Sequence, residues 1–202
     1  MVCTGNICRS PMAAALLASR LRDAGVHAHV HSAGMVEDGR PATDHGIAVM
    51  ASRGIDTSPH RSRRLRPELV ATADVIVGMS RAHVREVVAT QPDAWPRTFT
   101  LKEIVRRGEE RGPRVPGQTL GEWVATLHSG RRTTDLLVDA EADDVADPIG
   151  RSRRVYERTA AELEALVDRL AGLLAGAPGL TGERSAPDLG AHAGEHPPAD
   201  RG

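Results

Sequence analysis

The segment from Val75 to Met79 constrains the fold more than any other part of the chain, because it is short, apolar throughout and flanked by helical patterns. Apolar residues recur at helical spacing in 67–73 before it and in the segment after Ser80. Continuous apolar runs of this length are typical of strands in a parallel sheet that helices cover on both faces. The order helix, strand, helix therefore predicts an α/β domain built from βαβ units.

Other elements are predicted from apolar spacing and from helix start and stop signals. Ser10 stands at the N-cap position and Pro11 at the first helical position of a helix that ends before Gly25. Apolar and polar residues alternate in 26–32, which predicts a strand that ends at 33–34. The remaining predictions are helices at 41–53, 101–107, 121–128 and 152–174, a strand at 97–100, a surface loop at 108–117 and an exposed acidic connection at 135–147.

The length of 202 residues corresponds to a single domain. All the periodic segments lie in residues 1–175, which we take as the folded domain. Residues 176–202 are rich in Gly, Pro, Ala, His and charge and show no periodicity. We expect this tail to be disordered, because it holds too few apolar residues to form a packed core.

Composition excludes several classes of function. The 26 basic and 27 acidic residues give a formal net charge of -1, which rules out a globally basic nucleic-acid binder. We find no run of 18 apolar residues and no basic segment followed by an apolar core at the N-terminus, so we expect neither a membrane span nor a signal peptide. The two cysteines are too few for a disulfide scaffold. We expect a cytoplasmic protein, and the sequence carries no signal for its oligomeric state.

The segment that joins Cys3 to Arg9 runs directly into the first predicted helix. The first turn of a helix presents unpaired N–H groups and a partial positive charge, and a short loop with Gly5 can wrap its amides around a tetrahedral oxyanion. The planar guanidinium of Arg9 can hold two oxygens of that anion at once. The same field stabilises a thiolate at Cys3, which makes this residue a candidate nucleophile.

The stretch CTGNICRSPMA at residues 3–13 resembles the phosphate-binding loop of the low-molecular-weight protein tyrosine phosphatases. Further matches to landmarks of that family follow in the same order along the chain, at 32–34, 73–83 and 147–148. The resemblance implies a three-layer α/β fold with a four-stranded, mainly parallel sheet flanked by helices. It also implies that the loop lies at the carboxyl end of a strand.

The resemblance implies a phosphomonoester hydrolase, and specifically a protein tyrosine phosphatase that acts on phosphorylated proteins. Cys3 would attack phosphorus to form a thiophosphate intermediate, Arg9 would bind the phosphoryl group, and Asp147 would serve as general acid and then as general base. In the same comparison Ser10 hydrogen-bonds the Cys3 sulfur, and Asn6 holds the strained loop. The phosphate-binding and supporting positions are Thr4, Gly5, Asn6, Ile7, Cys8 and Ser10. No metal or cofactor is implied, because Arg9 and the loop amides supply the positive charge.

Two positions bear on the substrate. Ile7 resembles the phosphotyrosine-directed members, whereas relatives that act on phosphoarginine tend to carry Thr there. Phosphotyrosine phosphatases of this family often place aromatic residues after the Asp-Pro pair, and this chain has Ile149 and Gly150 instead. Two alternative functions remain open. One is a thiol-dependent arsenate reductase, which would need an external thiol because Cys3 and Cys8 are the only cysteines; the other is a non-catalytic anion-binding module.

The loop also departs from the family at its start. Family members normally have an apolar strand of several residues before the nucleophile, whereas only Met1 and Val2 precede Cys3. We therefore expect the first strand to be truncated at the N-terminus and Cys3 to lie on a frayed end. Cys8 resembles the second loop cysteine of the family, and our hypothesis is that it forms a reversible disulfide with Cys3 under oxidation.

Three other features have simple structural explanations. His27, His29 and His31 would lie on one solvated strand face rather than in a zinc site. The arginines in 61–66 either steer a phosphorylated partner or form an ordinary charged surface. We expect the aromatic residues to pack in the core; they are Trp95, Phe99, Trp123 and Tyr156.

Overall fold

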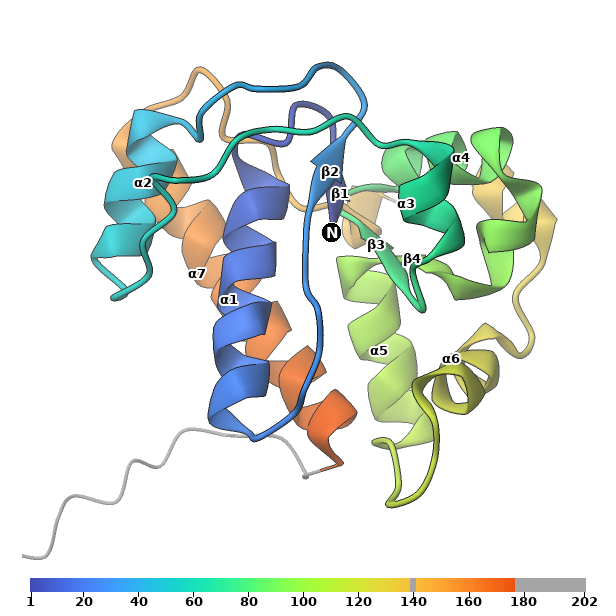
Figure 1. Cartoon of the computed structure of the whole chain (residues 1–202). Coiled ribbons are helices and arrows are strands. Elements are labelled where there is room, and N and C mark those ends of the chain that lie inside the picture. The colour runs from blue at the N-terminus through green and yellow to red at the C-terminus, as the bar shows by residue number, and fades with distance from the viewer. Residues whose placement is uncertain (139–140, 177–202) are drawn as a thin grey trace, which may run out of the picture.

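A four-stranded, fully parallel sheet forms the centre of the molecule (Figure 1). The computed structural model describes residues 1–138 and 141–176. The strands are β1 (Val2–Cys3), β2 (Ala33–Gly34), β3 (Ile76–Gly78) and β4 (Thr98–Thr100), and they lie in the order β2-β1-β3-β4. This arrangement confirms the predicted fold class. The predicted tail lies outside the described residues except for Gly176, so the proposed domain boundary stays a prediction.

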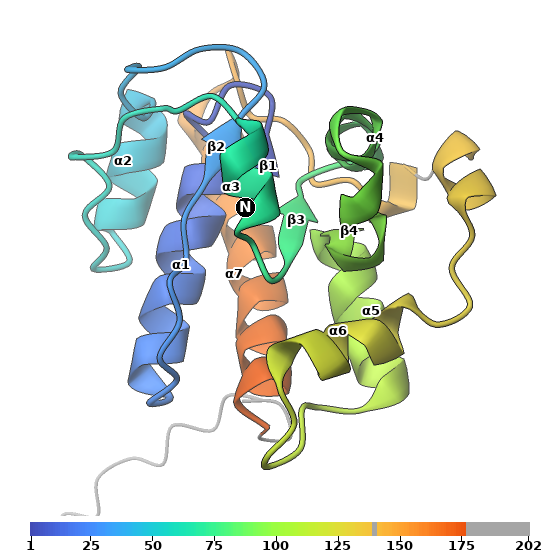
Figure 2. The ribbon, with the colours of Figure 1, turned by 45° about the vertical axis from the view of Figure 1, so that its right-hand side comes forward.

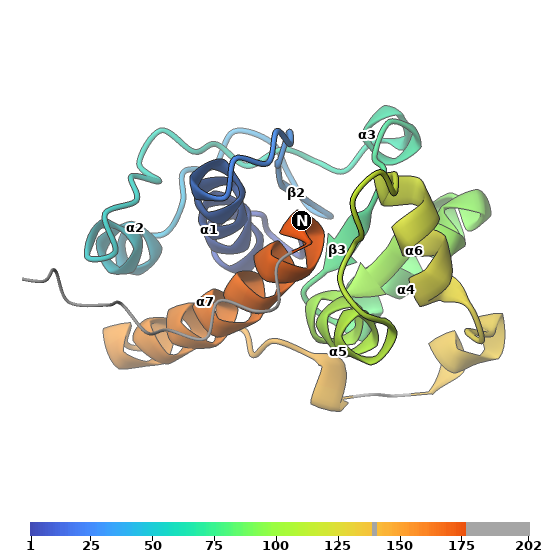
Figure 3. The same ribbon diagram turned by 90° about the horizontal axis from the view of Figure 1, so that it is seen from below.

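Helices cover both faces of the sheet. The α-helices are α1 (Arg9–Asp23), α2 (Asp44–Ala51), α3 (Pro67–Ala71), α4 (Arg81–Thr90), α5 (Leu101–Arg111), α6 (Leu120–His128) and α7 (Arg153–Ala175). Short 3-10 helices are η1 (Pro92–Arg97), η2 (Thr133–Leu137) and η3 (Glu141–Asp143). Helix α7 lies between α1 and α5 (Figure 2), and α2 packs beside the N-terminal end of α7, next to α1 (Figure 3). None of the described helices is long and apolar enough to cross a membrane.

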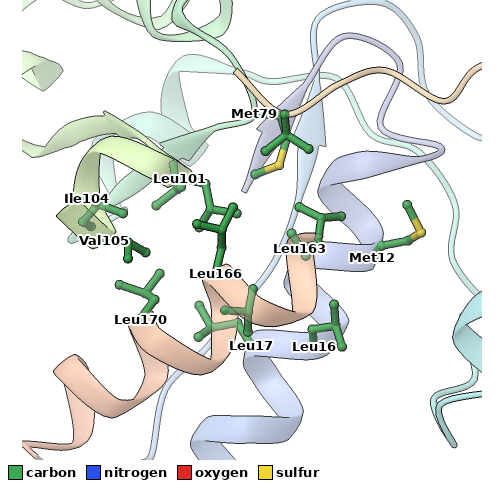
Figure 4. Packing of buried hydrophobic residues seen from close by; sticks show 14 of the residues in the cluster. Met12, Leu16, Leu17, Met79, Leu101, Ile104, Val105, Leu163, Leu166 and Leu170 are labelled. Atoms are coloured by element: carbon green, nitrogen blue, oxygen red, sulfur yellow. The ribbon is translucent and has the colours of Figure 1, made fainter. Parts of the chain in front are cut away.

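The main core lies between the sheet and the helices α1, α5 and α7 (Figure 4). Its members recur at helical spacing on each of the three helices: Met12, Leu16 and Leu17 on α1, Leu101, Ile104 and Val105 on α5, and Leu163, Leu166 and Leu170 on α7. Leu16 and Leu163 are fully buried, and burial of such a side chain stabilises the fold by about 1.5–3 kcal/mol. The four predicted aromatic core residues are all buried, as expected.

The sheet separates this core from a second, smaller apolar layer. Within β1, Cys3 belongs to the main core and Val2 to the second layer. Within β3, Val77 belongs to the main core and Ile76 to the second layer. This alternation follows from the two-residue period of a strand. Because both faces are apolar, the run Val75–Met79 has no polar positions, as the sequence pattern indicated.

The predicted strand over 26–32 is wrong, because only Ala33–Gly34 pairs with β1. Just before β2, the Met1 amino group donates to the His31 carbonyl at 2.8 Å, and the Met1 carbonyl accepts the Ala33 N–H at 3.0 Å. Residues 26–32 belong to no strand and run as an irregular segment. His27 and His29 are exposed in this segment, as predicted, whereas His31 is partly buried, so its predicted solvated position is wrong.

The first strand is short, as expected, but Cys3 does not lie on a frayed end. Val2 pairs with Ala33 on one side and with Gly78 on the other, and Met79 N–H donates to the Val2 carbonyl at 2.9 Å. Val2 and Cys3 are 3% and 2% exposed. Pairing with both neighbouring strands fixes the position of Cys3, because the backbone of a central strand is hydrogen-bonded on both edges.

Three boundaries differ from their predictions for local physical reasons. Helix α1 starts at Arg9 with Cys8 as N-cap, and Ser10 lies inside the first turn instead of capping it. Helix α2 starts only at Asp44, where the Thr43 hydroxyl accepts the Gly46 N–H. Helix α5 continues through Gly108 to Arg111, because tertiary contacts described below override the helix-breaking composition of that segment.

The acidic connection over 135–147 is not uniformly exposed. It contains η3 and part of η2, and residues 139–140 lie outside the described residues. Asp143 is 5% exposed and Val145 is 1% exposed. The prediction of an exposed loop is wrong for these two residues, because arginines from other elements neutralise Asp143 and the apolar core takes up Val145.

Candidate active site

The loop from Thr4 to Cys8 connects the carboxyl end of β1 to the first turn of α1 (Figure 1). The carboxyl edge of a parallel sheet is where α/β proteins bind ligands, since loops and helix N-termini converge there. Helix α1 has no acidic residue in its first turn, and no side chain caps it, so its terminal N–H groups are not hydrogen-bonded to a capping carboxylate. The sequence thus places the predicted anion-binding loop at the edge where its amides can act together.

Cys3 is held among hydrogen-bond donors at the base of this loop. Its sulfur lies 3.0 Å from the Ser10 hydroxyl oxygen and accepts the backbone N–H of Asn6 at 3.3 Å. Both neighbours come from the loop and the first turn of α1. The Cys3 sulfur is therefore hydrogen-bonded from both the loop and the helix that follows it.

Asn6 holds the loop in shape from its centre. Its backbone φ of 51° is the one positive value outside glycine in the part of the chain that the structure describes. The side-chain amide donates to Ser10 at 2.9 Å and to Ser32 at 2.8 Å, and its oxygen accepts the Arg63 N–H at 2.9 Å. The His60 ring contacts the Asn6 carbonyl at 2.7 Å. The contact with Ser10 ties the loop to α1, and the other three tie it to two more distant segments of the chain.

Gly34 allows the loop to pack directly on β2. A Cβ at this position would lie 2.8 Å from the backbone nitrogen of Asn6 and 2.8 Å from the Thr4 carbonyl oxygen. Real Cβ atoms do not approach backbone that closely, so a larger residue would push the loop away. The same Thr4 carbonyl accepts the Met35 N–H at 2.8 Å. This explains in physical terms why the sequence landmark at 32–34 ends in glycine.

Arg9 and Asp147 meet although 138 positions separate them. The Arg9 side chain is 7% exposed; its Nη2 pairs with the Asp147 carboxylate and its Nη1 donates to the Val145 carbonyl at 3.1 Å. Asp147 is 37% exposed at its side chain and also accepts the Ile149 N–H at 3.1 Å. The predicted acid thus reaches the predicted anion-binding fork and keeps access to solvent.

His83 contacts the loop from α4, and the sequence reasoning assigned it no role. Its Nε2 lies 3.0 Å from the Thr4 hydroxyl, and its Nδ1 lies 2.7 Å from the Ser80 hydroxyl. Burial and the nearby Arg9 charge lower the pKa of His83 to about 4, so the ring is neutral at pH 7. His83 belongs to the family landmark at 73–83 and lies in the first turn of the helix after β3. That position was the feature of the sequence from which a contact with the loop could have been predicted.

Cys8 faces a different set of partners from Cys3. Its sulfur lies 3.2 Å from the Tyr156 hydroxyl and 3.6 Å from the Thr43 hydroxyl. Burial raises the pKa of the Cys8 thiol above its ordinary value. Both cysteines are free thiols in this structure. The reversible disulfide between them stays a prediction.

The other predicted loop residues support the backbone. Ile7 is 6% exposed, and its carbonyl accepts the Thr43 N–H at 3.0 Å, which fixes the loop against the start of α2. Gly5 is partly exposed, and a Cβ there would lie 3.4 Å from the Ile7 side chain. Of the basic cluster at 61–66, Arg63 belongs to the site support, since its Nε also donates to the Ser32 carbonyl at 2.8 Å.

Comparison with protein families decides the identity of this loop. The family model described as "Low molecular weight phosphotyrosine protein phosphatase" matches residues 1–116. The chain belongs to this family. Low-molecular-weight phosphatases are cysteine-dependent hydrolases, so this chain is an enzyme of that class and the predicted resemblance is confirmed. The arsenate reductase alternative is not favoured.

Curated relatives include phosphatases of two specificities. The protein-arginine-phosphatase of Geobacillus stearothermophilus is 37% identical over 171 residues, which cover 84% of this chain and 90% of the relative. The probable low molecular weight protein-tyrosine-phosphatase EpsP of Ralstonia solanacearum is 45% identical over 105 residues, which cover 52% of this chain and 70% of the relative.

Solved structures of the family share the fold. The YwlE arginine phosphatase from Geobacillus stearothermophilus matches with a TM-score of 0.62 at 36% identity and covers 84% of this chain and 87% of that one. The low molecular weight protein tyrosine phosphatase from T. tengcongensis matches with a TM-score of 0.64 at 32% identity and covers 84% and 93%. A YwlE mutant described with a phosphorylated active site serine matches with a TM-score of 0.64 at 30% identity and covers 84% and 90%.

Proposed function

We propose that this low-molecular-weight phosphatase hydrolyses phosphotyrosine in proteins through Cys3, Arg9 and Asp147. The observation that carries the proposal is the convergence of these three side chains on one loop. Cys3 lies at its base, Arg9 begins the helix that follows it, and Asp147 pairs with Arg9 from the segment before α7.

In the first step the Cys3 sulfur attacks phosphorus, and the bond from phosphorus to the ester oxygen breaks. Arg9 and the loop amides hold the non-bridging oxygens, whose charge grows as the transition state forms. Protonated Asp147 gives its proton to the leaving oxygen, which departs as an alcohol or phenol. The product of this step is a thiophosphate on Cys3.

In the second step a water molecule attacks the thiophosphate. The Asp147 carboxylate takes a proton from that water, the bond between sulfur and phosphorus breaks, and inorganic phosphate leaves. The Cys3 thiolate is restored, and its hydrogen bonds to Ser10 and Asn6 stabilise it as a leaving group. One carboxyl group serves both steps because it ends the first step in the form that the second step needs.

Hydrolysis of para-nitrophenyl phosphate tests the mechanism. Cys3→Ser should abolish turnover while inorganic phosphate still binds, because the hydroxyl is a much weaker nucleophile and Arg9 with the loop amides remains. Asp147→Asn should lower kcat/KM by about 10²–10⁴-fold for esters with poor leaving groups and by less for good ones. Turnover at the normal rate by the Cys3→Ser variant would show that the mechanism is wrong.

Phosphoarginine is the second candidate substrate, because relatives that cover most of this chain are named protein-arginine-phosphatases. Ile7 favours phosphotyrosine, since it supplies a buried apolar side chain where phosphoarginine-directed relatives tend to have Thr. A pair of peptides that differ only in phosphotyrosine or phosphoarginine decides between them by kcat/KM. We expect the phosphotyrosine peptide to be preferred and Ile7→Thr to shift the ratio toward phosphoarginine.

We place the substrates among phosphorylated proteins of the cytoplasm, and we expect no nucleic-acid partner. The support for this setting is chemical, because the proposed reaction needs Cys3 as a free thiol. Reducing compartments keep such thiols available. Fractionation of cells with an antibody against the chain checks the location.

A further inference from the structure

A buried ionic cluster lies beside the active site, and the mechanism above does not use it. Its central members are Arg81 at the start of α4, Glu103 in α5 and Asp143 in η3, whose side chains are 9%, 5% and 6% exposed. Arg81 pairs with Asp143 at 2.7 Å and with Glu103 at 3.4 Å. Glu103 is held in turn by Arg131 at 2.9 Å. The cluster therefore connects α4 and α5 to the segment that precedes Asp147.

Asp143 is fixed by two arginines at once. Arg81 donates to one carboxylate oxygen at 2.7 Å, and Arg106 donates to the other at 2.6 Å. Burial alone pushes the pKa of Asp143 up, but the hydrogen bonds and charges of Arg106 and Arg81 outweigh burial and hold it below the ordinary value. Asp143 is therefore ionised and doubly bonded at neutral pH.

The two residues after Asp143 are bonded to the same region. The Asp144 carboxylate accepts the backbone N–H of Arg81 at 2.7 Å, which occupies a free donor of the first turn of α4. The Val145 N–H donates to the Met79 carbonyl at 2.9 Å, and its side chain is buried. Side-chain and backbone contacts thus secure three successive residues to the end of β3 and the start of α4.

Arg9 contacts the C-terminal end of this segment. It donates to the Val145 carbonyl at 3.1 Å and pairs with Asp147 two residues later. A displacement of the segment would therefore move the acid and an acceptor of the phosphate-binding arginine together. A misplacement of about 1 Å at a reacting group can reduce a rate by about 10²-fold.

We propose that Arg81 and Asp143 are positioning residues that set where Asp147 stands relative to the leaving oxygen. The proposal rests on the proposed function, because it assigns these residues to the proton transfer of that reaction. A buried ion pair is weak evidence of a stabilising role, since well-packed apolar residues can often replace it without loss of stability. A directional ion pair does what apolar packing cannot, because its hydrogen bonds fix the segment in one register.

The test compares Asp143→Asn with the control Asp168→Asn. Asp168 is also a carboxylate in an arginine pair, bonded to Arg20 at 2.6 Å, but that pair lies at the end of α1 opposite the loop. The readout is kcat/KM for phenyl phosphate, a poor leaving group, against para-nitrophenyl phosphate, a good one. We expect Asp143→Asn to lower kcat/KM for phenyl phosphate by about tenfold more than kcat/KM for para-nitrophenyl phosphate. Asp168→Asn should lower the two values equally or leave both unchanged.

A double variant separates positioning from general damage. If Asp143 acts through Asp147, then Asp143→Asn should cause no further loss in kcat/KM for phenyl phosphate once Asp147→Asn is present. Equal losses in both backgrounds would overturn the proposal, and so would an unchanged leaving-group ratio in Asp143→Asn.

A second variant covers the case in which Asp143→Asn does not fold. Arg106→Gln removes only the half-exposed partner of Asp143, whose side chain is 50% exposed, and leaves the buried partner Arg81 in place. We expect the same change of leaving-group ratio at about threefold. An unchanged ratio in this variant also overturns the proposal. Failure of the proposed function is seen separately, as normal turnover in Cys3→Ser.

Discussion

Asn6 combines backbone strain with three side-chain hydrogen bonds, and this combination gives the loop its shape. A left-handed backbone is unfavourable by about 1–2 kcal/mol for an ordinary residue, and asparagine tolerates it best among residues with a side chain. Its bonds to Ser10, Ser32 and the Arg63 backbone offset that strain. The sequence supplied the identity of this residue through the family resemblance, but not its partners, because Ser32 and Arg63 lie 26 and 57 positions away.

Substitution of Asn6 separates strain from hydrogen bonding. We expect Asn6→Ala to lower the free energy of unfolding by about 2–4 kcal/mol, because it loses the buried hydrogen bonds and keeps the left-handed strain. Asn6→Gly loses the same bonds without the strain and should regain about 1 kcal/mol. Urea unfolding of both variants measures the difference. Equal stability of the two would contradict the assignment of strain at this position.

His83 makes the stability depend on pH. Its pKa of about 4 lies below the ordinary value of 6.5, so between these pH values the unfolded chain binds a proton that the native protein does not. Stability is therefore fully present above about pH 6.5 and falls as the pH drops toward 4. We expect wild type to lose about 2 kcal/mol more than His83→Gln between pH 7 and pH 5, measured by urea unfolding. Parallel losses would show that His83 is protonated in the native protein.

At the scale of elements, tertiary contacts decide where local patterns stop. The composition of 108–117 predicts a loop from Gly108 onward, yet α5 runs to Arg111. Gly108 faces α7 and α6, where a Cβ would lie 2.6 Å from Leu173 and 3.3 Å from the Trp123 ring. The glycine thus lets the helices approach. Sequence periodicity could not show this, because Leu173, the side chain that Gly108 approaches, lies 65 positions later in the chain.

Gly108→Ala tests that contact against helix propensity. Alanine favours a helix over glycine by about 1 kcal/mol, whereas overpacking a core typically destabilises by about 1–3 kcal/mol. We expect a net loss of about 1 kcal/mol in the free energy of unfolding. Gly121→Ala in α6 is the matched control, since its Cβ meets nothing within 4 Å and should stabilise by up to about 1 kcal/mol. Stabilisation by both substitutions would show that the space at Gly108 is not limiting.

For the whole molecule, the sheet order brings together residues that are far apart in the sequence. Strand β1 lies between β2 and β3, so the loop after it contacts Ser32 and His83 at one edge, where Arg9 at the start of α1 contacts the segment before α7. The family resemblance predicted this topology and the residues of the loop. It did not predict the burial of Asp143. An acidic segment is expected to be exposed to solvent, and the sequence does not show that Arg81 and Arg106 pair with Asp143.

This arrangement couples phosphate binding to the stability of the whole fold. A ligand that binds only the native state stabilises it by about 2.7 kcal/mol at a concentration of 100 times its Kd, which for a domain of this size corresponds to a rise in Tm of about 5–10 °C. We expect inorganic phosphate to produce such a rise. Arg9→Lys should reduce it strongly, because an ammonium keeps the charge but lacks the planar fork that holds two oxygens.

The matched control for Arg9→Lys is Arg20→Lys, which changes the same residue type in the last turn of the same helix. That variant should lose some stability through its pairs with Asp168 and Glu164 but keep the full rise in Tm with phosphate. Differential scanning calorimetry with and without phosphate measures both effects. If phosphate protects the two variants equally, the anion binds elsewhere than at the loop between β1 and α1.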